Sequence, residues 1–137
     1  MFVDGAVLDA IVRHAQEAAP NECCGLLIGN EEWIEEAVRT RNAKESPSTY
    51  QVDPADHFAL IRRTRAEQRQ IIGAYHSHTR SAAQPSPRDI AESHDESLVH
   101  LIVSLAAAEP RVAAFRIRKG AAEAEAVALS IRPSAGC

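Results

Sequence analysis

The chain is organised around the stretch QIIGAYHSHTRSAAQPSPRD, residues 70–89. Its apolar opening predicts a strand, and this strand runs into His76 and His78. Residues two apart on a strand point to the same face, so we expect the two imidazoles to converge. Asp89 completes the pattern His-x-His-x7-Ser-x-x-Asp. Two imidazole nitrogens and one carboxylate, with a fourth position left open, are typical of a catalytic zinc site.

The segment from Ser86 to Asp89 has a second interpretation, as the start of a helix. Ser86 would be the N-cap, Pro87 would occupy N1, and Asp89 would be the acid at N3. Taken alone, these four residues favour this structural interpretation. The two interpretations are compatible, because a capped helix start would hold Asp89 rigidly, as a metal ligand requires. The joint pattern is expected by chance in only about one chain in a thousand of this length.

Glu22 stands before a continuous apolar run, residues 23–29, which predicts a strand buried on both faces. In a partly dry cleft the pKa of its carboxyl group should rise, which suits a general base. Alone, Glu22 would be interpreted as a solvated strand end; with the histidines and Asp89 downstream, it becomes a candidate base. The adjacent Cys23 and Cys24 would point to opposite faces of the strand, and we interpret them as buried, inert thiols.

The rest of the sequence predicts a mixed α/β fold over residues 1–131, a β-sheet sandwiched by helices, followed by a loose tail over 132–137. Helices are expected at 4–19, from Asp53 onward with Phe58 and Ile61 on one face, and at about 86–96. Further strands are expected at 33–40, 98–106, 111–118 and about 124–131. We interpret the remaining histidines and a cluster of arginines as structural or solvated: His14, His57, His94, His100, Arg62, Arg63, Arg65 and Arg69.

Composition excludes several classes of protein. A length of 137 residues suits one domain, and 45% apolar residues argue against disorder. A net charge of −4 without a basic run argues against a nucleic-acid partner. No apolar run approaches the roughly 18 residues that cross a membrane, and the start does not read as a signal peptide. Three cysteines make no even disulfide framework, so we expect a cytoplasmic protein.

The pattern of His76, His78, Ser86 and Asp89, with Glu22 upstream, resembles the motif of the JAMM metalloproteases, also called MPN-plus domains. The resemblance covers nearly the whole chain. It implies the JAMM/MPN fold, which is similar in outline to that of cytidine deaminases. It also implies Zn²⁺ held by His76, His78 and Asp89, with Glu22 as the general base and Ser86 as a hydrogen-bond donor to the oxyanion of a hydrolysed amide.

The polar segment 41–54 resembles the NA-x-x-SP-x-x-Y stretch of a bacterial subgroup of this family, at Asn42, Ser46, Pro47 and Tyr50. That subgroup includes the Mec-plus-like (CysO-cysteine) hydrolases, which release cysteine from the C-terminus of a ubiquitin-like sulfur-carrier protein. The resemblance implies such a carrier tail as the substrate, in a groove lined by Asn42, Ser46 and Tyr50. An ordinary surface loop is the other interpretation of this segment.

Two other functions stay open at this point. One is a non-catalytic MPN scaffold, which only assembles complexes. The other is a metal-binding protein without turnover. The presence of every motif residue, including a candidate base beside an open metal position, favours the hydrolase over both.

Overall fold

The structure is a computed structural model that describes residues 1–93, 95–118 and 120–132. His94 and residues 133–137 of the predicted tail therefore lie outside the described residues. The elements are β1 (Phe2–Asp4), α1 (Gly5–Ala18), β2 (Cys24–Gly29), β3 (Trp33–Thr40), α2 (Pro54–Ala66), β4 (Gln70–His78), α3 (Pro87–Ala91), β5 (Val99–Ser104), β6 (Arg111–Arg116), β7 (Glu125–Val127) and β8 (Ser130–Arg132).

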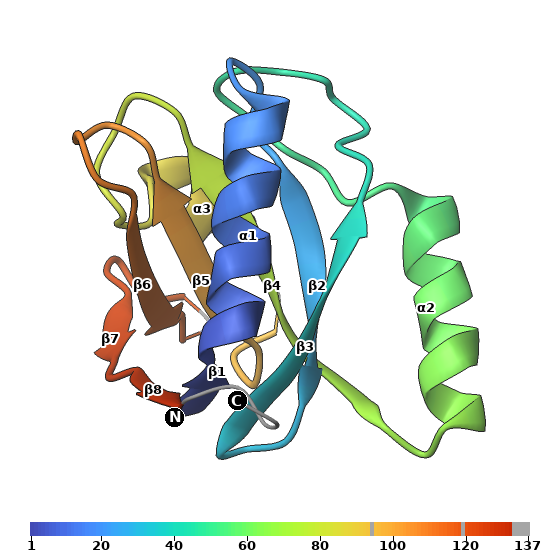
Figure 1. Ribbon diagram of the computed structural model, residues 1–137. Coiled ribbons are helices and arrows are strands. Elements are labelled where there is room, and N and C mark those ends of the chain that lie inside the picture. The colour runs from blue at the N-terminus through green and yellow to red at the C-terminus, as the bar shows by residue number, and fades with distance from the viewer. Residues whose placement is uncertain (94, 119, 133–137) are drawn as a thin grey trace.

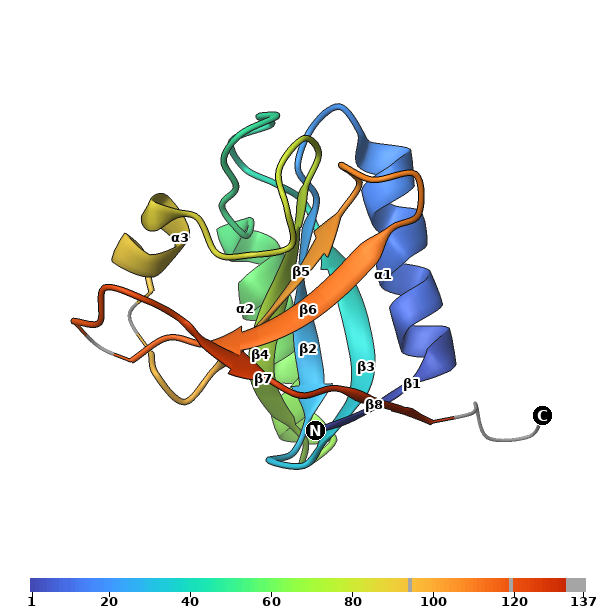
Figure 2. The ribbon, with the colours of Figure 1, turned by 90° about the vertical axis from the view of Figure 1, so that its left-hand side faces the viewer.

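The eight strands form one mixed sheet in the order β7-β6-β5-β4-β2-β3-β1-β8 (Figure 1). The predicted metal-loop strand, β4, lies in the interior of this sheet, antiparallel to β2 and parallel to β5. The two edge strands, β7 and β8, follow one another in the chain. Only a short connection separates them, because the sheet is curled (Figure 2). His76 is thus held from both sides by the strand ladder, and His78 from the side of β5.

Helices α1 and α2 cover opposite faces of the sheet (Figure 1). The buried residues of α1 recur every four positions, at Val7, Ile11 and Ala15. Leu27 belongs to the core under α1, whereas Leu26 and Ile28 pack with Leu60 of α2. Because successive side chains of a strand point to opposite faces, the apolar run of β2 is buried on both faces, as predicted.

The C-terminal part of the chain differs from the prediction of one strand at about 124–131. Two three-residue strands, β7 and β8, are found instead, on opposite edges of the sheet. Strand β8 pairs with β1, and the Ser130 N–H donates to the Met1 carbonyl at 2.9 Å. Strand β1 was not predicted from the sequence, because three residues are too few to show a period. Strands β5 and β6 are also shorter than expected.

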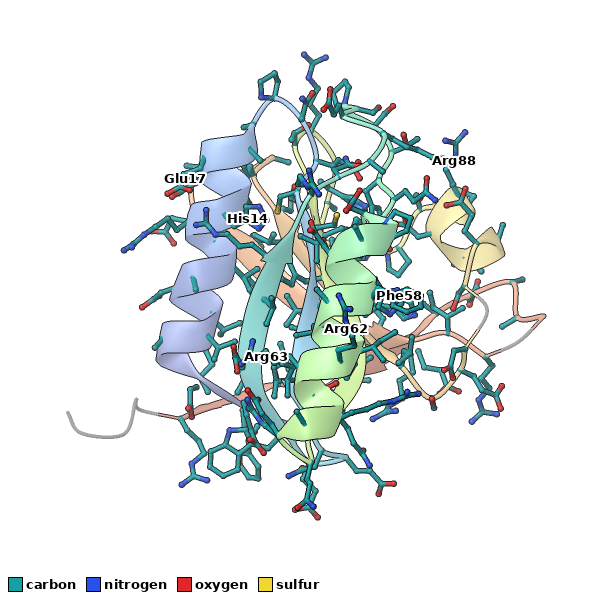
Figure 3. The ribbon with its side chains drawn as sticks, turned by 90° about the vertical axis from the view of Figure 1, so that its right-hand side faces the viewer. His14, Glu17, Phe58, Arg62, Arg63 and Arg88 are labelled. Atoms are coloured by element: carbon teal, nitrogen blue, oxygen red, sulfur yellow. The ribbon has the colours of Figure 1, made fainter. Side chains whose placement is uncertain are left out.

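The helix predicted at 86–96 was also too long. Helix α3 ends at Ala91 and buries none of its own five residues (Figure 2), so little packing stabilises it. The face of α2 predicted to carry Phe58 and Ile61 is not its buried face. Phe58 is 66% exposed and points outward with Arg62, while Leu60 and Thr64 are buried (Figure 3).

Two of the arginines predicted as solvated are engaged in ion pairs. Arg63 and Arg69 both contact the carboxylate of Glu36 on β3, at 2.8 Å in each case. Both side chains are about one third exposed, so screening by solvent keeps the contribution of each pair to stability small, about 0–1 kcal/mol. The pairs connect α2 and the start of β4 to β3.

Tyr75, next to His76 on β4, is fully buried and points toward α1. A side chain at position 25 of β2 would overlap its ring, so glycine is required there. The Tyr75 hydroxyl lies 2.7 Å from Nδ1 of His14, which was predicted to be solvated. His14 is in fact half-buried, and burial lowers its pKa. The Gly25–Tyr75–His14 contact thus fixes β4 against α1 beside the predicted ligands.

Candidate active site

Three potential ligand groups converge where β4 ends and α3 begins. The Nε2 atom of His76 lies 3.1 Å from Nε2 of His78 and 3.1 Å from Oδ2 of Asp89, and the last two atoms are 3.2 Å apart. A tetrahedral zinc ion with bonds of about 2.0–2.1 Å has ligand atoms about 3.3 Å apart. The triangle of nitrogen and oxygen atoms therefore fits one face of such a coordination sphere.

The two histidines owe their placement to the strand. His76 pairs with Cys24 of β2 and Ile102 of β5, and both imidazoles are buried. The Nδ1 atom of His78 lies 2.9 Å from the Ala82 carbonyl oxygen, a hydrogen bond that the sequence did not indicate. A carbonyl accepts only, so Nδ1 carries the hydrogen and Nε2 presents a lone pair to the cluster in the neutral ring.

Asp89 is held by the predicted helix start. The Ser86 hydroxyl oxygen accepts a hydrogen bond from the Asp89 N–H at 3.0 Å, and Oδ2 of Asp89 accepts from the Ser86 N–H at 2.8 Å. This reciprocal pair is a capping box. The Oδ2 atom that completes the box is also the atom that faces His76 and His78. The two interpretations of Ser86-Pro87-Arg88-Asp89 thus coexist in one geometry.

Two of the three groups in the cluster, Asp89 and His76, have charge states that suit metal binding. Burial alone would raise the pKa of Asp89, but its interactions with His76 and His78 outweigh burial and hold that pKa well below its usual range. Burial lowers the pKa of His76. Burial would also lower the pKa of His78, but its bonds to Asp89 and Ala82 outweigh this and raise it. An ionised Asp89 and a neutral His76 are the ligand forms that bind metal.

A cleft of about 340 Å³ opens beside the cluster. It is lined by Glu22, Pro47, Ser48, His78, Thr79, Arg80, Ser81 and Ser86. Glu22 is only 7% exposed, and burial raises its pKa to about 7, although the positive charge of a protonated His78 opposes this. The cleft therefore contains the predicted base, one of the predicted ligands, and the predicted hydroxyl donor.

The Ser86 hydroxyl group still has a hydrogen available for donation. Its oxygen accepts from the Asp89 N–H, while its hydrogen has no acceptor among the residues that the structure describes. A hydroxyl group both donates and accepts. Ser86 is thus able to donate to a group bound in the cleft while it caps α3.

The segment 41–53 contacts both a candidate ligand, His76, and the candidate base, Glu22. The ring of Tyr50 stacks on the imidazole of His76, with centroids 4.2 Å apart and planes 16° apart. The Glu22 N–H donates to the Ser46 carbonyl at 2.8 Å, and the amide of Asn42 donates to the Glu22 carbonyl at 3.0 Å. Pro47 and Ser48 form one wall of the cleft. Contact of Asn42, Ser46 or Tyr50 with a substrate stays a prediction.

The remaining candidates lie apart from this chemistry. Cys23 and Cys24 are buried free thiols, as expected, and burial raises the pKa of Cys23 to about 11, so it is protonated at neutral pH. His57 is exposed. His100 is partly buried, with its Nε2 3.4 Å from the Ser93 hydroxyl oxygen.

Comparison with known proteins identifies the family of this chain. Residues 5–118 match the family described as prokaryotic homologs of the JAB domain. The chain belongs to this family. The predicted relationship to the bacterial JAMM/MPN proteins is thereby confirmed.

Over the described residues, none of the helices has the length and apolar character needed to cross a membrane.

Individual relatives of this JAB-domain chain are peptidases by name. It is 29% identical over 106 residues to the CysO-cysteine peptidase of Mycobacterium tuberculosis, covering 76% of this chain and 73% of the relative. It is 34% identical over 96 residues to the "Probable TtuB-protein conjugate cleaving protease" of Thermus thermophilus, covering 68% of this chain and 63% of the relative.

A solved structure also resembles this chain closely. A protein from Desulfitobacterium hafniense matches it with a TM-score of 0.87 at 28% identity, over 98% of this chain and 94% of that one. The predicted α/β fold, with helices on both faces of a mixed sheet, is confirmed.

Proposed function

We propose that this JAB-domain chain is a zinc-dependent peptidase that hydrolyses an amide bond at the C-terminus of a ubiquitin-like sulfur-carrier protein. The observation that carries the proposal is the cleft that brings Glu22 and Ser86 beside His78 and its triangle of ligand atoms. The names of the relatives from Mycobacterium and Thermus, a CysO-cysteine peptidase and a protein-conjugate protease, support the substrate class.

His76, His78 and Asp89 would hold the zinc ion through two Nε2 atoms and one Oδ2 atom. When bound, such an ion polarises a carbonyl group and makes water acidic enough to lose a proton near neutral pH. The stacked ring of Tyr50 and the Ala82 carbonyl would keep the two imidazoles in place.

Two side chains in the cleft would move protons and stabilise charge. The Glu22 carboxylate would accept a proton from the attacking water and return it to the leaving nitrogen. Its pKa of about 7 makes both steps accessible at neutral pH. The Ser86 hydroxyl would donate a hydrogen bond to the substrate carbonyl oxygen as this oxygen gains negative charge. Loss of one such donor typically lowers the rate by about 10²–10³-fold.

The shape of the cleft suits an extended tail without bulky side chains. Its lining includes Pro47 and Ser48 from one segment and residues 79–81 from another. The Thr79 hydroxyl lies 3.5 Å from the Pro47 carbonyl oxygen, so the two segments meet beside the cleft. A Gly-Gly tail, as in ubiquitin-like carriers, fits such a passage because glycine allows close approach of the backbone.

Arg80 favours cysteine over lysine as the leaving amine. It lines the cleft and forms no ion pair among the described residues. The carboxylate of a C-terminal cysteine adduct is attached to the same carbon as the amide nitrogen that is released. In a conjugate to a lysine side chain of a protein, the α-carboxyl group of the lysine is part of a peptide bond, so the released amine has no such carboxylate beside it. A guanidinium in the cleft would therefore bind the first kind of leaving group directly.

Mass spectrometry of a sulfur-carrier protein bearing a C-terminal cysteine tests the reaction. We expect the loss of one cysteine in the presence of the zinc-loaded protein and no loss after chelation. If the zinc-loaded protein cleaves neither this adduct nor a lysine conjugate, the hydrolase proposal is wrong, and the scaffold interpretation replaces it.

A second pair of substrates tests the leaving group. We expect Arg80→Ala to raise KM about tenfold for the cysteine adduct and to have little effect on the corresponding cysteinamide, which lacks the carboxylate. Arg62→Ala, on the exposed face of α2, is the matched control and should affect neither substrate (Figure 3). Equal KM values for the Arg80 and Arg62 variants would exclude carboxylate recognition by Arg80 while leaving the hydrolase itself intact.

A further inference from the structure

Glu22 bonds to the segment 41–53, whereas the next residue, Cys23, bonds to Ser77 of β4. Glu22 precedes β2, which begins at Cys24, so it lies outside the strand ladder. Both main-chain groups of Glu22 instead bond to this segment. Its N–H donates to the Ser46 carbonyl at 2.8 Å, and its carbonyl oxygen accepts from Nδ2 of Asn42 at 3.0 Å. The position of the carboxyl group in the cleft therefore depends on the shape of residues 41–53.

Asn42 maintains that shape with its whole side chain. Its Nδ2 donates to the carbonyls of Glu22 and Thr49, and its Oδ1 accepts from the N–H groups of Lys44 and Gln51, with all four distances 3.0 Å. A side-chain amide offers two N–H donors and two acceptor positions, so the capacity of Asn42 is filled. No other natural side chain of this length supplies two donors and an acceptor oxygen.

The same segment also reaches the ligand cluster. An isolated bridge pairs Asn42 with Val52, and the Ala43 N–H donates to the Gln51 carbonyl at 2.8 Å, which closes the segment at its base. Just before the bridge, Tyr50 stacks on His76. One closed segment thus contacts the candidate base through its backbone and a candidate ligand through its ring.

We propose that Asn42 is a positioning residue that sets the Glu22 carboxylate relative to the His76, His78 and Asp89 cluster. This inference rests on the proposed role of Glu22 as the general base. Catalysis by a base requires correct geometry, and a displacement of about 1 Å costs roughly 10²-fold in rate. Removal of the Asn42 donors would free the Glu22 carbonyl and allow the carboxyl group to move.

A merely structural role for Asn42 makes a different prediction. In that case its replacement would lower the melting temperature but leave kcat and the mobility of Glu22 unchanged in the folded protein. Asn30 provides a matched control, because its Oδ1 accepts from the N–H groups of Glu32 and Trp33, at 2.8 and 2.9 Å, in the turn between β2 and β3. That turn contributes no residue to the cleft.

The test compares Asn42→Asp, Asn42→Ala and Asn30→Ala with the parent protein. Asn42→Asp keeps the shape and the acceptor oxygens but loses both donors. For both Asn42 variants we expect unchanged zinc content, a kcat lowered about 10–100-fold, and a KM within about twofold. We also expect amide hydrogen exchange at Glu22 to rise at least about tenfold, with or without metal. Asn30→Ala should leave kcat and exchange at Glu22 unchanged.

The two readouts separate this inference from the proposed function. Exchange at Glu22 needs no turnover. It reports on the bond from the Glu22 N–H to Ser46, in the segment that Asn42 closes, even if no conjugate is cleaved. Unchanged exchange at Glu22 in Asn42→Asp would overturn the inference, whatever the kinetics. Increased exchange together with parental kcat and an unshifted pH–rate profile would overturn it as well, because a freed Glu22 that works equally well was not being positioned.

Discussion

The two halves of the candidate site are built in different ways. His76 and His78 stand on β4 inside the strand ladder, and Asp89 is fixed by a capping box. Glu22 lies outside the ladder and depends on hydrogen bonds to the segment 41–53. The ligand half thus derives its geometry from regular backbone repeats, whereas the base half derives it from one loop. Loop changes should therefore alter proton transfer before they alter metal binding.

The largest effect is expected from breaking the ligand half. His78→Ala removes one nitrogen of the ligand triangle, so we expect zinc content to fall close to zero and conjugate cleavage to fall by more than about 10⁴-fold. Metal analysis and the cleavage assay measure both effects. His57→Ala removes an exposed histidine and serves as the control. Full zinc occupancy in His78→Ala would exclude His78 as a ligand.

Breaking the base half should leave the metal in place. Glu22→Gln preserves the size of the side chain but removes the proton acceptor, so we expect a loss of about 10²–10⁴-fold in kcat with unchanged zinc content. Zinc analysis of the variant, followed by single-turnover cleavage, separates the two quantities. A fully active Glu22→Gln protein would show that another group takes the proton.

Ser86 holds the candidate ligand Asp89 and also lines the cleft beside Glu22, so its variants test both halves of the site. Ser86→Ala removes the cap of α3 and the proposed oxyanion donor, and we expect a loss of about 10²–10³-fold in kcat and about 1 kcal/mol in stability. Ser86→Thr keeps a hydroxyl group that can perform both roles. Chemical denaturation and kcat are measured for both variants. Similar kcat values for Ser86→Ala and the parent would limit Ser86 to capping.

The smallest effect is the dependence on pH. The pKa of Glu22 is about 7, and the base acts only in its ionised form. Its ionised fraction rises with pH, so kcat/KM should increase about tenfold from pH 6 to pH 8 and level off above that. The residual activity of Glu22→Gln should lack this rise. A parent profile that is flat between pH 6 and pH 8 would contradict the assignment.

The contrast between the halves also explains which parts of the site the sequence predicts. The two-residue period of His76 and His78 and the cap at Ser86 are local patterns, and both appear in the structure as expected. The bonds from Asn42 and Ser46 to Glu22 join segments at least 20 residues apart. No periodicity marks such bonds, so the contact between Asn42 and Glu22 could not be predicted from the sequence.

The same distinction applies to the fold. Helix α1 and the long strands have clear apolar patterns and were predicted from them, whereas α2 and α3 were predicted from their N-cap residues. The division of residues 124–131 into β7 and β8 depends on the curl of the whole sheet, which brings Ser130 to Met1. The orientation of α2 was missed because its buried face consists of Leu60 and Thr64, which do not form a marked apolar stripe.

The contact among Gly25, Tyr75 and His14 has a consequence for how the chain can diverge. Any side chain at position 25 would occupy the space of the Tyr75 ring, and loss of that ring would leave His14 without its partner. Single changes at these positions are therefore disfavoured, although a combined change restores the fit. Among related sequences the three positions should covary, although they lie on three separate elements. A substitution at one of them should be accompanied by substitutions at the others.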